Sequence, residues 1–436
     1  MATTAKSIIK IREVVGKIKF DARNGKLPQK VLKRFIHCVD CVVDERVEGM
    51  ITYPLKYLLL LTFLGVLSGA ENFVDIANFS ESYKPKLNGI IPEFKEHGVP
   101  SHDTFRTVLG LICPDQLQKA ASNFLLDEIK QLQKTLGIET KEKELLNIDG
   151  KEQRGTGRKH NTDQEVGNLQ TLHIYNASIG ICLHSKPINE KTNEIPTAQE
   201  LLKEMQLKDC IVTFDAMNTQ KETIRIISEQ KGDYVGALKK NHPLFYKEIE
   251  LLFSDNALES IRKKGKNYRT YTEKSHNCIE KRTYYLSTNI KWFNDLPLWK
   301  KLKSFICYDL ETEDIITGKK TNERRYYISS LTDIELVSDS IRGHWSVEQL
   351  HWHLDVAFSE DDNRTMDKNA FNNLSIINKM VLSLLKLVQP MYKVGIKTIR
   401  KRFGWNLIEH LTDLLSLLDE EMVAEALQNP ISKTQK

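Results

Sequence analysis

Three acidic residues of the sequence have the surroundings expected of divalent-cation ligands. Asp149 in NIDGK and Asp215 in VTFDAMNTQ each follow a short apolar run typical of a strand, and a strand-end carboxylate beside a turn is well placed to bind a cation. Glu348 lies in the later stretch GHWSVEQLHWHLD. If the three converge, they can hold two Mg²⁺ ions that activate a water or a 3′-hydroxyl for in-line displacement at a phosphate. For an aspartate taken alone, turn capping is the competing interpretation.

The histidines around Glu348 allow a second interpretation. His344, Glu348 and His351 recur at spacings of four and three, which would place them on one helical face with ligand spacing suited to zinc. The stretch lacks an HExxH motif, however, and His351 beside Trp352 and His353 is typical of a helix packed against a sheet. We favour packing over zinc for these histidines.

Basic residues follow both aspartates in the sequence. The loop KEQRGTGRKH comes after Asp149, and its glycines would permit close approach to a phosphate backbone while its cations neutralise phosphate. Two more lysines follow the apolar run DYVGAL. A solvated surface position is the alternative at each of these sites. The candidate phosphate-binding residues are Lys151, Arg154, Arg158, Lys159, Lys239 and Lys240.

The composition is that of an ordinary folded protein. The 436 residues are 40% hydrophobic and 28% charged, with a net charge of +5 that is compatible with a polyanionic partner but does not require one. Seven cysteines without a regular framework indicate reduced thiols in the cytosol. The most apolar run, starting at Tyr53, is shorter than the roughly 20 residues that span a bilayer. It predicts a buried helix, and we expect no membrane segment.

Changes in hydrophobic periodicity divide the chain into parts. The middle part predicts the order βββαβαβ, which is that of an α/β ribonuclease H-like core, and there the strands ending in Asp149 and Asp215 are neighbours. We expect an N-terminal helical domain at 1–141, with an accessory or DNA-binding role, and the first part of the core at 142–241. A β-rich insertion is expected at 242–335. The core helix with Glu348 should follow at 336–370, and a helical C-terminal region at 371–436.

Together these stretches resemble the DDE transposases of bacterial insertion sequences, of the ISAs type that includes the H-repeat-associated proteins. The resemblance is carried by YPLKYLLLLTFLGVLSGA with SHDTFRTVL near the N-terminus, NIDGKEQRG, VTFDAMNTQ, DYVGALKKNH, and RGHWSVEQLHWHLDVAFSEDDNRTMDKNAFNNLS. The stretches occur in the family's order and cover most of the chain from about Arg12 onward.

The resemblance implies an enzyme that cuts DNA at the ends of its element and joins the freed 3′-hydroxyls to target DNA. It implies Asp149, Asp215 and Glu348 as the catalytic and metal-binding triad, with two Mg²⁺ ions that Mn²⁺ can replace. It also implies double-stranded DNA as the partner, both terminal inverted repeats and target, a dimer on paired ends, and a cytoplasmic, nucleoid-associated bacterial protein. Arg342 as a phosphate contact and Trp345 as a base-stacking residue complete the expected DNA-binding set, with core packing the alternative for Trp345.

The chain departs from the signature of related transposases around the glutamate. Those proteins have a Tyr seven residues before it, an Arg four before and a Lys seven after, where this chain has Ile341, His344 and Asp355. A seven-residue step returns to nearly the same helical face, so Asp355 lies near Glu348 and cannot replace a phosphate-binding lysine. Asp355 is expected to orient a ligand, contact a metal or contribute nothing, while Arg342 and the loop lysines supply positive charge.

Two other functions could use the same residues. A transposase-derived protein could bind element ends without cutting them, although the chain retains all three carboxylates. A ribonuclease H-like structure-specific nuclease, such as a junction resolvase, would cut without joining strands. The helical N-terminal part and the β-rich insertion favour a transposase, because a minimal nuclease needs neither.

Overall fold

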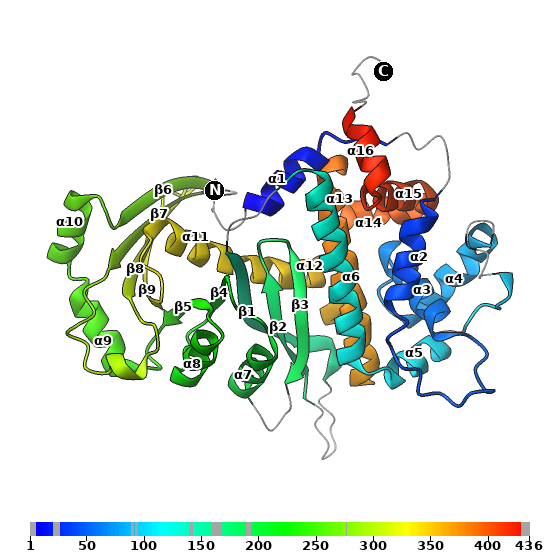
Figure 1. Ribbon diagram of the computed structural model, residues 1–436, viewed down its shortest axis with the longest axis horizontal. Coiled ribbons are helices and arrows are strands. Elements are labelled where there is room, and N and C mark those ends of the chain that lie inside the picture. Colours follow the sequence, from blue (N-terminus) through cyan, green and yellow to red (C-terminus); the bar gives the residue numbers. More distant parts are fainter. Residues whose placement is uncertain are drawn as a thin grey trace.

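A nine-stranded sheet runs through the protein, whose computed structural model describes residues 6–20, 27–88, 91, 95–138, 143–157, 167–188, 193–275 and 277–428 (Figure 1). Many helices accompany this sheet, so the protein is a mixed α/β protein as predicted. The strands are β1 (Glu144–Gln153), β2 (Leu169–Asn176), β3 (Ile181–Ile188), β4 (Cys210–Phe214), β5 (Asp233–Leu238), β6 (Tyr268–Ser275), β7 (Cys278–Ser287), β8 (Ser304–Asp314) and β9 (Lys320–Ser329).

The strand order is β3-β2-β1-β4-β5-β9-β8-β7-β6. β1 pairs antiparallel with β2 and parallel with β4, and β4 pairs parallel with β5. With α7 (Glu194–Glu204) after β3 and α8 (Lys221–Glu229) after β4, the first five strands follow the expected order βββαβαβ. The insertion expected to be β-rich contains β6 to β9, and these strands extend the same sheet because β9 pairs antiparallel with β5.

Two helices precede β6 where the sequence predicted only antiparallel strands. They are α9 (Pro243–Leu252) and α10 (Asp255–Lys264). Pro243 takes the first helical position, where its missing N–H costs nothing, and Gly265 ends α10 with a left-handed φ of 69°. Phe245 and Ile249, four residues apart, are the buried contacts of α9. Such residues are typical of helices. The prediction of strands alone followed the alternating pattern further along the insertion and missed them.

The two faces of the sheet carry different helices (Figure 1). Leu146 and Ile148 of β1 share a core with α7 and α8, whereas Leu145 belongs to a core with Val337 and Ile341 on the other face. That second face is covered by α11 (Ile334–His344) and joined by α12 (Ser346–Phe358). The period of two along a strand therefore assigns alternate side chains of β1 and β4 to opposite layers.

The remaining helices form one hydrophobic core with part of the sheet. At its centre lies α13, which contacts helices from both ends of the chain and β3. Although α13 is long and apolar enough to cross a membrane, 78% of its apolar window is buried inside the protein, which makes it a core helix. These helices are α1 (Lys6–Val15), α2 (Gln29–Cys38), α3 (Leu55–Leu67), α4 (Phe73–Leu87), α5 (His102–Leu111), α6 (Pro114–Thr135), α13 (Lys368–Tyr392), α14 (Ile396–Trp405), α15 (Leu407–Leu417) and α16 (Glu420–Gln428).

One N-terminal prediction is confirmed in this core. The apolar run after Tyr53 forms α3, and all residues of α3 except Lys56 are buried. Further along, Ser101 caps α5, because its side chain accepts a hydrogen bond of 3.2 Å from the backbone N–H of Thr104.

Candidate active site

The parallel pairing of β1 and β4 brings the two aspartates together. Asp215 follows the last residue of β4 as predicted, but the strand end predicted at Asp149 is wrong, because β1 continues past it to Gln153 in pairing with β2. In the parallel pairing Asn147 lies opposite Thr213, and Thr213 Oγ1 donates a hydrogen bond of 2.7 Å to Asn147 Oδ1. Asp149 and Asp215 each lie two residues further along, so they point from the same face as this polar pair, towards α11 and α12. The paired register ends at Ile148, one residue before Asp149. The strands therefore position both carboxylates at the point where the sheet opens.

Glu348 approaches this edge on a helix that begins at a break the sequence did not reveal. The stretch 336–370 was expected to form one helix, but α11 ends at His344 and α12 starts at Ser346. The carbonyl of Gly343 accepts hydrogen bonds from Asn147 Nδ2 at 2.8 Å and from Ser346 Oγ at 2.7 Å, which satisfies the helix end. A Cβ atom at residue 343 would lie 2.3 Å from Leu145 Cδ2, so any residue larger than glycine would require the Leu145 side chain to move.

The three predicted acidic residues lie close enough to influence each other's charge. Burial, followed by the charges of Asp215, Glu194 and Glu348, raises the pKa of Asp149 to about 7. Glu348 lies in the first turn of α12 and is exposed. Asp215 Oδ1 accepts hydrogen bonds from the backbone N–H and the Nδ2 of Asn218, at 3.0 and 3.2 Å. The arrangement is an open, electronegative site at the sheet edge.

Glu194 is the member of this group that sequence reasoning missed. It is the first residue of α7, and the preceding Asn193 caps that helix by accepting a hydrogen bond from the N–H of Ile195. Burial and the charge of Asp215 raise the pKa of Glu194 as well. The local sequence contains no signal for this role, because an acidic residue in the first turn of a helix is ordinary.

The donor chemistry of the site fits a hard divalent cation. Carboxylate oxygens are the ligands that Mg²⁺ prefers, and a cation among like charges would relieve the repulsion that contributes to the raised pKa of Asp149. Within the described ranges, no three His, Cys, Asp or Glu side chains converge as a ready-made metal site. Binding would therefore require the side chains to move together from the arrangement seen here.

The histidines of the Glu348 stretch form hydrogen bonds to the sheet. His344 Nδ1 lies 2.8 Å from Thr213 Oγ1, and His351 Nε2 lies 2.8 Å from His173 Nδ1 on β2. Burial lowers the pKa of His344 to about 4 and that of His351 to about 3, so both rings are neutral at pH 7. Because α11 ends at His344, the continuous helix that the zinc interpretation required is absent between His344 and Glu348. The geometry supports the packing interpretation.

Lys151 does not occupy the exposed loop position that the sequence suggested. It lies within β1 with its side chain 5% exposed, and its ammonium forms ion pairs with Asp355 and, at 3.3 Å, with Asp361. This contact also accounts for Asp355, the acidic residue found where relatives have a lysine. Because its ammonium is held by these two carboxylates, Lys151 is not free to contact phosphate.

Replacing Lys151 by Met is expected to lower the free energy of unfolding by roughly 1.5–3 kcal/mol, because Asp355 and Asp361 lose a charged hydrogen-bond donor. Urea unfolding measures the loss, and Lys208→Met, which removes an exposed lysine, should change stability by no more than about 0.5 kcal/mol. A double-mutant cycle with Asp355→Asn should show coupling. If the two substitutions lowered the free energy of unfolding additively, the ion pair between Lys151 and Asp355 would be contradicted.

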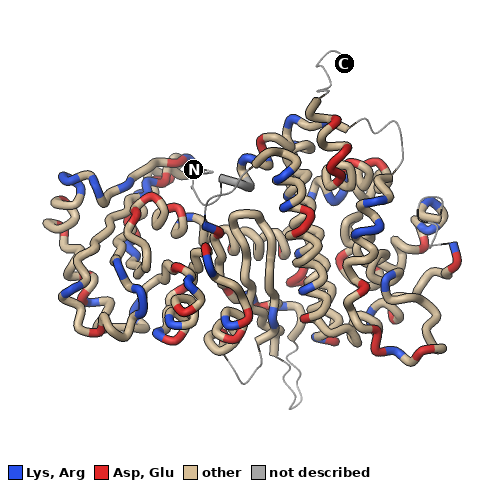
Figure 2. Tube along the Cα trace, in the orientation of Figure 1, with Lys and Arg blue, Asp and Glu red and all other residues tan. Residues whose placement is uncertain are grey.

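The other predicted basic residues have different surroundings. Arg154, Lys239 and Lys240 are exposed, and the Arg154 backbone N–H donates to Asp361 Oδ1 at 3.3 Å. Arg158 and Lys159 lie outside the described residues. Elsewhere Lys and Arg alternate with Asp and Glu along most elements (Figure 2). Positive charge near the site thus comes from a few side chains rather than from a uniformly basic face.

Trp345 lies at the helix break among three arginines. The guanidinium carbons of Arg282 and Arg342 are each 5.2 Å from its ring centroid, and that of Arg325 is 5.6 Å away. Tyr308 meets the ring edge-on with centroids 6.3 Å apart, and Trp345 is half-buried. Arg282 and Arg325 come from β7 and β9, so the sheet extension contributes to the surroundings of the Glu348 helix. Sequence reasoning placed Arg342 and Trp345 together but missed the other two arginines, which are distant in sequence.

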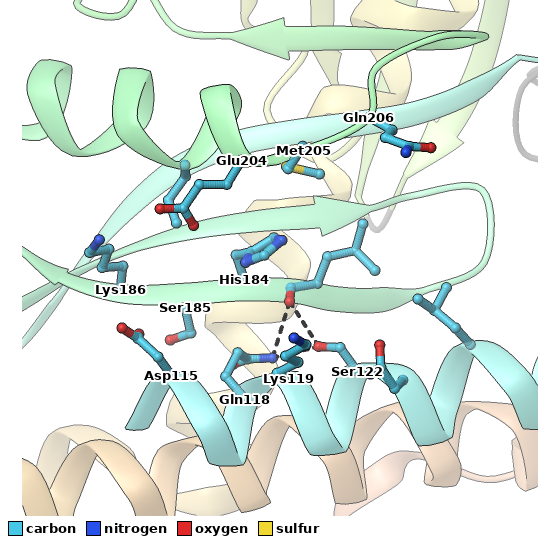
Figure 3. Close-up of a pocket in the computed structure, with 14 residues that line it drawn as sticks. Asp115, Gln118, Lys119, Ser122, His184, Ser185, Lys186, Glu204, Met205 and Gln206 are labelled. Atoms are coloured by element: carbon cyan, nitrogen blue, oxygen red, sulfur yellow. Dashed lines mark hydrogen bonds between the residues drawn. The ribbon is translucent and has the colours of Figure 1, made fainter. Parts of the chain in front are cut away.

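The structure also contains a cavity away from these residues. A space of about 470 Å³ lies between α6, β3 and α7, and Gln118 Nε2 and Ser122 Oγ at its wall donate hydrogen bonds to the carbonyl of Leu183 (Figure 3). No residue predicted for catalysis or DNA binding lines it. The carboxylates instead occupy an open edge, as a site for a large substrate requires.

Several known proteins similar to this chain are described as transposases. The family model described as "Transposase DDE domain" matches residues 140–384, and one described as "DDE_Tnp_1-associated" matches 36–125. "H repeat-associated putative transposase YhhI" of Escherichia coli (strain K12) is 29% identical over 372 residues, covering 84% of this chain and 93% of that protein. "Putative transposase YncI" of Escherichia coli O157:H7 is 30% identical over 380 residues, covering 86% and 93%. A solved structure described as a piggyBac transposase synaptic complex with hairpin DNA is 12% identical with a TM-score of 0.38, covering 93% of this chain and 83% of that chain.

Proposed function

Since the chain belongs to the family of DDE transposases of the H-repeat type, we propose that it is a metal-dependent enzyme that cuts DNA at the ends of its element and transfers the freed 3′-hydroxyls to target DNA. The observation that carries this proposal is the group formed by Asp149, Asp215 and Glu348 at one open edge of the sheet, where burial and neighbouring charges raise the pKa of Asp149. Such a group can serve phosphoryl transfer on a large substrate.

We assign the first five strands to a ribonuclease H-like core. The order β3-β2-β1-β4-β5, with β2 antiparallel to β1 and with β1, β4 and β5 parallel, supports this assignment. In this arrangement the two aspartates come from adjacent parallel strands and the glutamate from a helix that follows the sheet extension.

In this proposal each acidic side chain has a distinct position around the reacting phosphate. Two bound Mg²⁺ or Mn²⁺ ions would activate the attacking oxygen and stabilise the leaving one. Asp149 within β1 and Asp215 just after β4 would hold the cations, and exposed Glu348 would complete the site from the first turn of α12. His351 Nδ1 lies 3.7 Å from Asp149 Oδ2, and its hydrogen bond to His173 fixes the ring, so His351 limits the orientations of the Asp149 carboxylate.

The DNA would be held by the exposed cations near this edge. Arg154, Lys239 and Lys240 are available to phosphates, and Arg342 adds charge beside Trp345. Terminal inverted repeats and target DNA are the double-stranded substrates of the proposal, and paired ends would be held by a dimer. Lys151 is left out of this set because it is buried in an ion pair.

The test is a reaction of the full chain with DNA that ends in the inverted repeats flanking its gene, together with a target plasmid. In Mg²⁺ or Mn²⁺ we expect cleavage at the repeat ends and covalently joined products, and in EDTA neither. Cleavage without joined products would point to a structure-specific nuclease. Binding without cleavage in both metals would overturn the proposal in favour of a silent DNA-binding protein.

A further inference from the structure

The carboxylate of Glu194 lies against β1 beside Asp149. Glu194 starts α7, which packs on the face of the sheet opposite α11 and α12 (Figure 1). A Cβ atom added at Gly150 would lie 2.2 Å from Glu194 Oε1 and 2.6 Å from its Cδ. The carboxylate therefore occupies the space that a side chain at residue 150 would fill, and glycine in the NIDGK stretch is what admits it.

Asn218 connects Glu194 to the second aspartate. Its side chain lies beside Glu194, and its Nδ2 donates a hydrogen bond of 3.2 Å to Asp215 Oδ1. Asn218 is fully buried, and its Oδ1 is an acceptor with no hydrogen-bond partner among the described residues. A buried polar atom without a partner beside acidic groups points to a missing ligand such as a hydrated cation.

The charge around Glu194 is not balanced within the protein. Among the described residues no lysine or arginine forms an ion pair with any of the four carboxylates, and the contact of Asp149 is with the imidazole of His351 at 3.7 Å. The N-terminus of α7 supplies only a partial positive charge to Glu194. Four acidic groups without a cation form an arrangement that a divalent ion would stabilise.

We propose that Glu194 is a fourth carboxylate ligand of the divalent cation, reaching Asp149 and Asp215 from the α7 side while Glu348 reaches them from α12. This inference rests on the proposed function, since it assigns a further residue to the same metal site. It gives Gly150 a defined role, which is to leave room for the Glu194 carboxylate next to β1.

The experiment is calorimetric titration of the metal-free full chain with MnCl₂. Glu194→Gln is expected to weaken Mn²⁺ binding at least about tenfold, and Gly150→Ala, which displaces the carboxylate without removing it, should weaken binding in the same direction. Glu200→Gln is the matched control on the same helix, because Glu200 pairs with Lys186 at the surface, and it should bind as the wild type does. In EDTA, Glu194→Gln should melt at the wild-type temperature or higher, because a repelling charge is removed.

The outcomes separate this inference from the proposed function. If Asp149→Asn abolishes Mn²⁺ binding and Glu194→Gln leaves the affinity unchanged, the role of Glu194 is refuted and the proposed site stands. If the wild type binds no Mn²⁺, or Asp149→Asn binds it normally, the proposed metal site itself fails. A purely structural Glu194 would give a lower melting temperature in EDTA with wild-type Mn²⁺ affinity, and that result also overturns the inference.

Discussion

Asp149→Asn, Asp215→Asn and Glu348→Gln are each expected to reduce cleavage at the element ends by at least about 10³-fold. A bound metal supplies several kcal/mol of transition-state stabilisation, and each ~1.4 kcal/mol lost costs a factor of ten in rate. The substitutions keep the size of each side chain and remove its charge, so the loss would come from the metal site. Single-turnover cleavage of end DNA with saturating enzyme measures the effect.

The same variants should bind end DNA nearly as tightly as the wild type, which separates lost chemistry from lost folding. Gln349→Ala is the matched control for Glu348, because Gln349 is the next exposed residue of α12 and makes no proposed contact with metal. Its cleavage rate should stay within about threefold of the wild-type rate. If Glu348→Gln cleaved as fast as Gln349→Ala, Glu348 would not belong to the catalytic group.

The strand-borne part of this site could be predicted from sequence for a simple physical reason. A short apolar run ending in an acidic residue and a turn identifies a strand end, and parallel neighbours place such ends at one edge. Asp215 satisfies that rule, whereas β1 continues past Asp149 to Gln153. The parallel pairing of β1 and β4 still brings the two residues together as the pattern predicts. The alternating segments of the sheet extension were recognisable for the same reason, because a period of two persists even in polar strands.

The parts that were missed depend on contacts between residues far apart in sequence. The helical periodicity of the sequence continues through Trp345, so it did not predict the break between α11 and α12. The break depends on Gly343, which packs on Leu145 and whose carbonyl accepts a hydrogen bond from Asn147. The sequence predicted Lys151 to be an exposed loop cation, but its ammonium forms an ion pair with Asp355. No local pattern could reveal such pairings, since each requires the relative positions of a strand and a helix.

The orientation of α12 also depends on helices at both ends of the chain. Arg400 of α14 is 3% exposed, and its guanidinium donates hydrogen bonds to the carbonyls of Ala357 in α12, Val66 in α3 and Ala70 after α3. Its charge also lies 4.2 Å from the ring centroid of Phe358. These carbonyls are at helix ends, where backbone acceptors lack partners and the dipole favours a cation. One side chain thus holds the C-terminal end of the Glu348 helix to the helical core.

Arg400→Met is therefore expected to lower the free energy of unfolding by at least about 2 kcal/mol. Each buried acceptor left without a donor costs about 1–3 kcal/mol, and the carbonyls of Ala357 and Ala70 lose their donor, whereas that of Val66 keeps the Gly69 N–H. Arg400→Lys should recover only part of the loss, because an ammonium keeps the charge but not the planar fork that reaches two helices. Urea unfolding provides the measurement, with Lys401→Met removing an exposed cation from the same helix as the control. Equal losses for Arg400→Met and Lys401→Met would show that Arg400 does not connect α12 to the helical core.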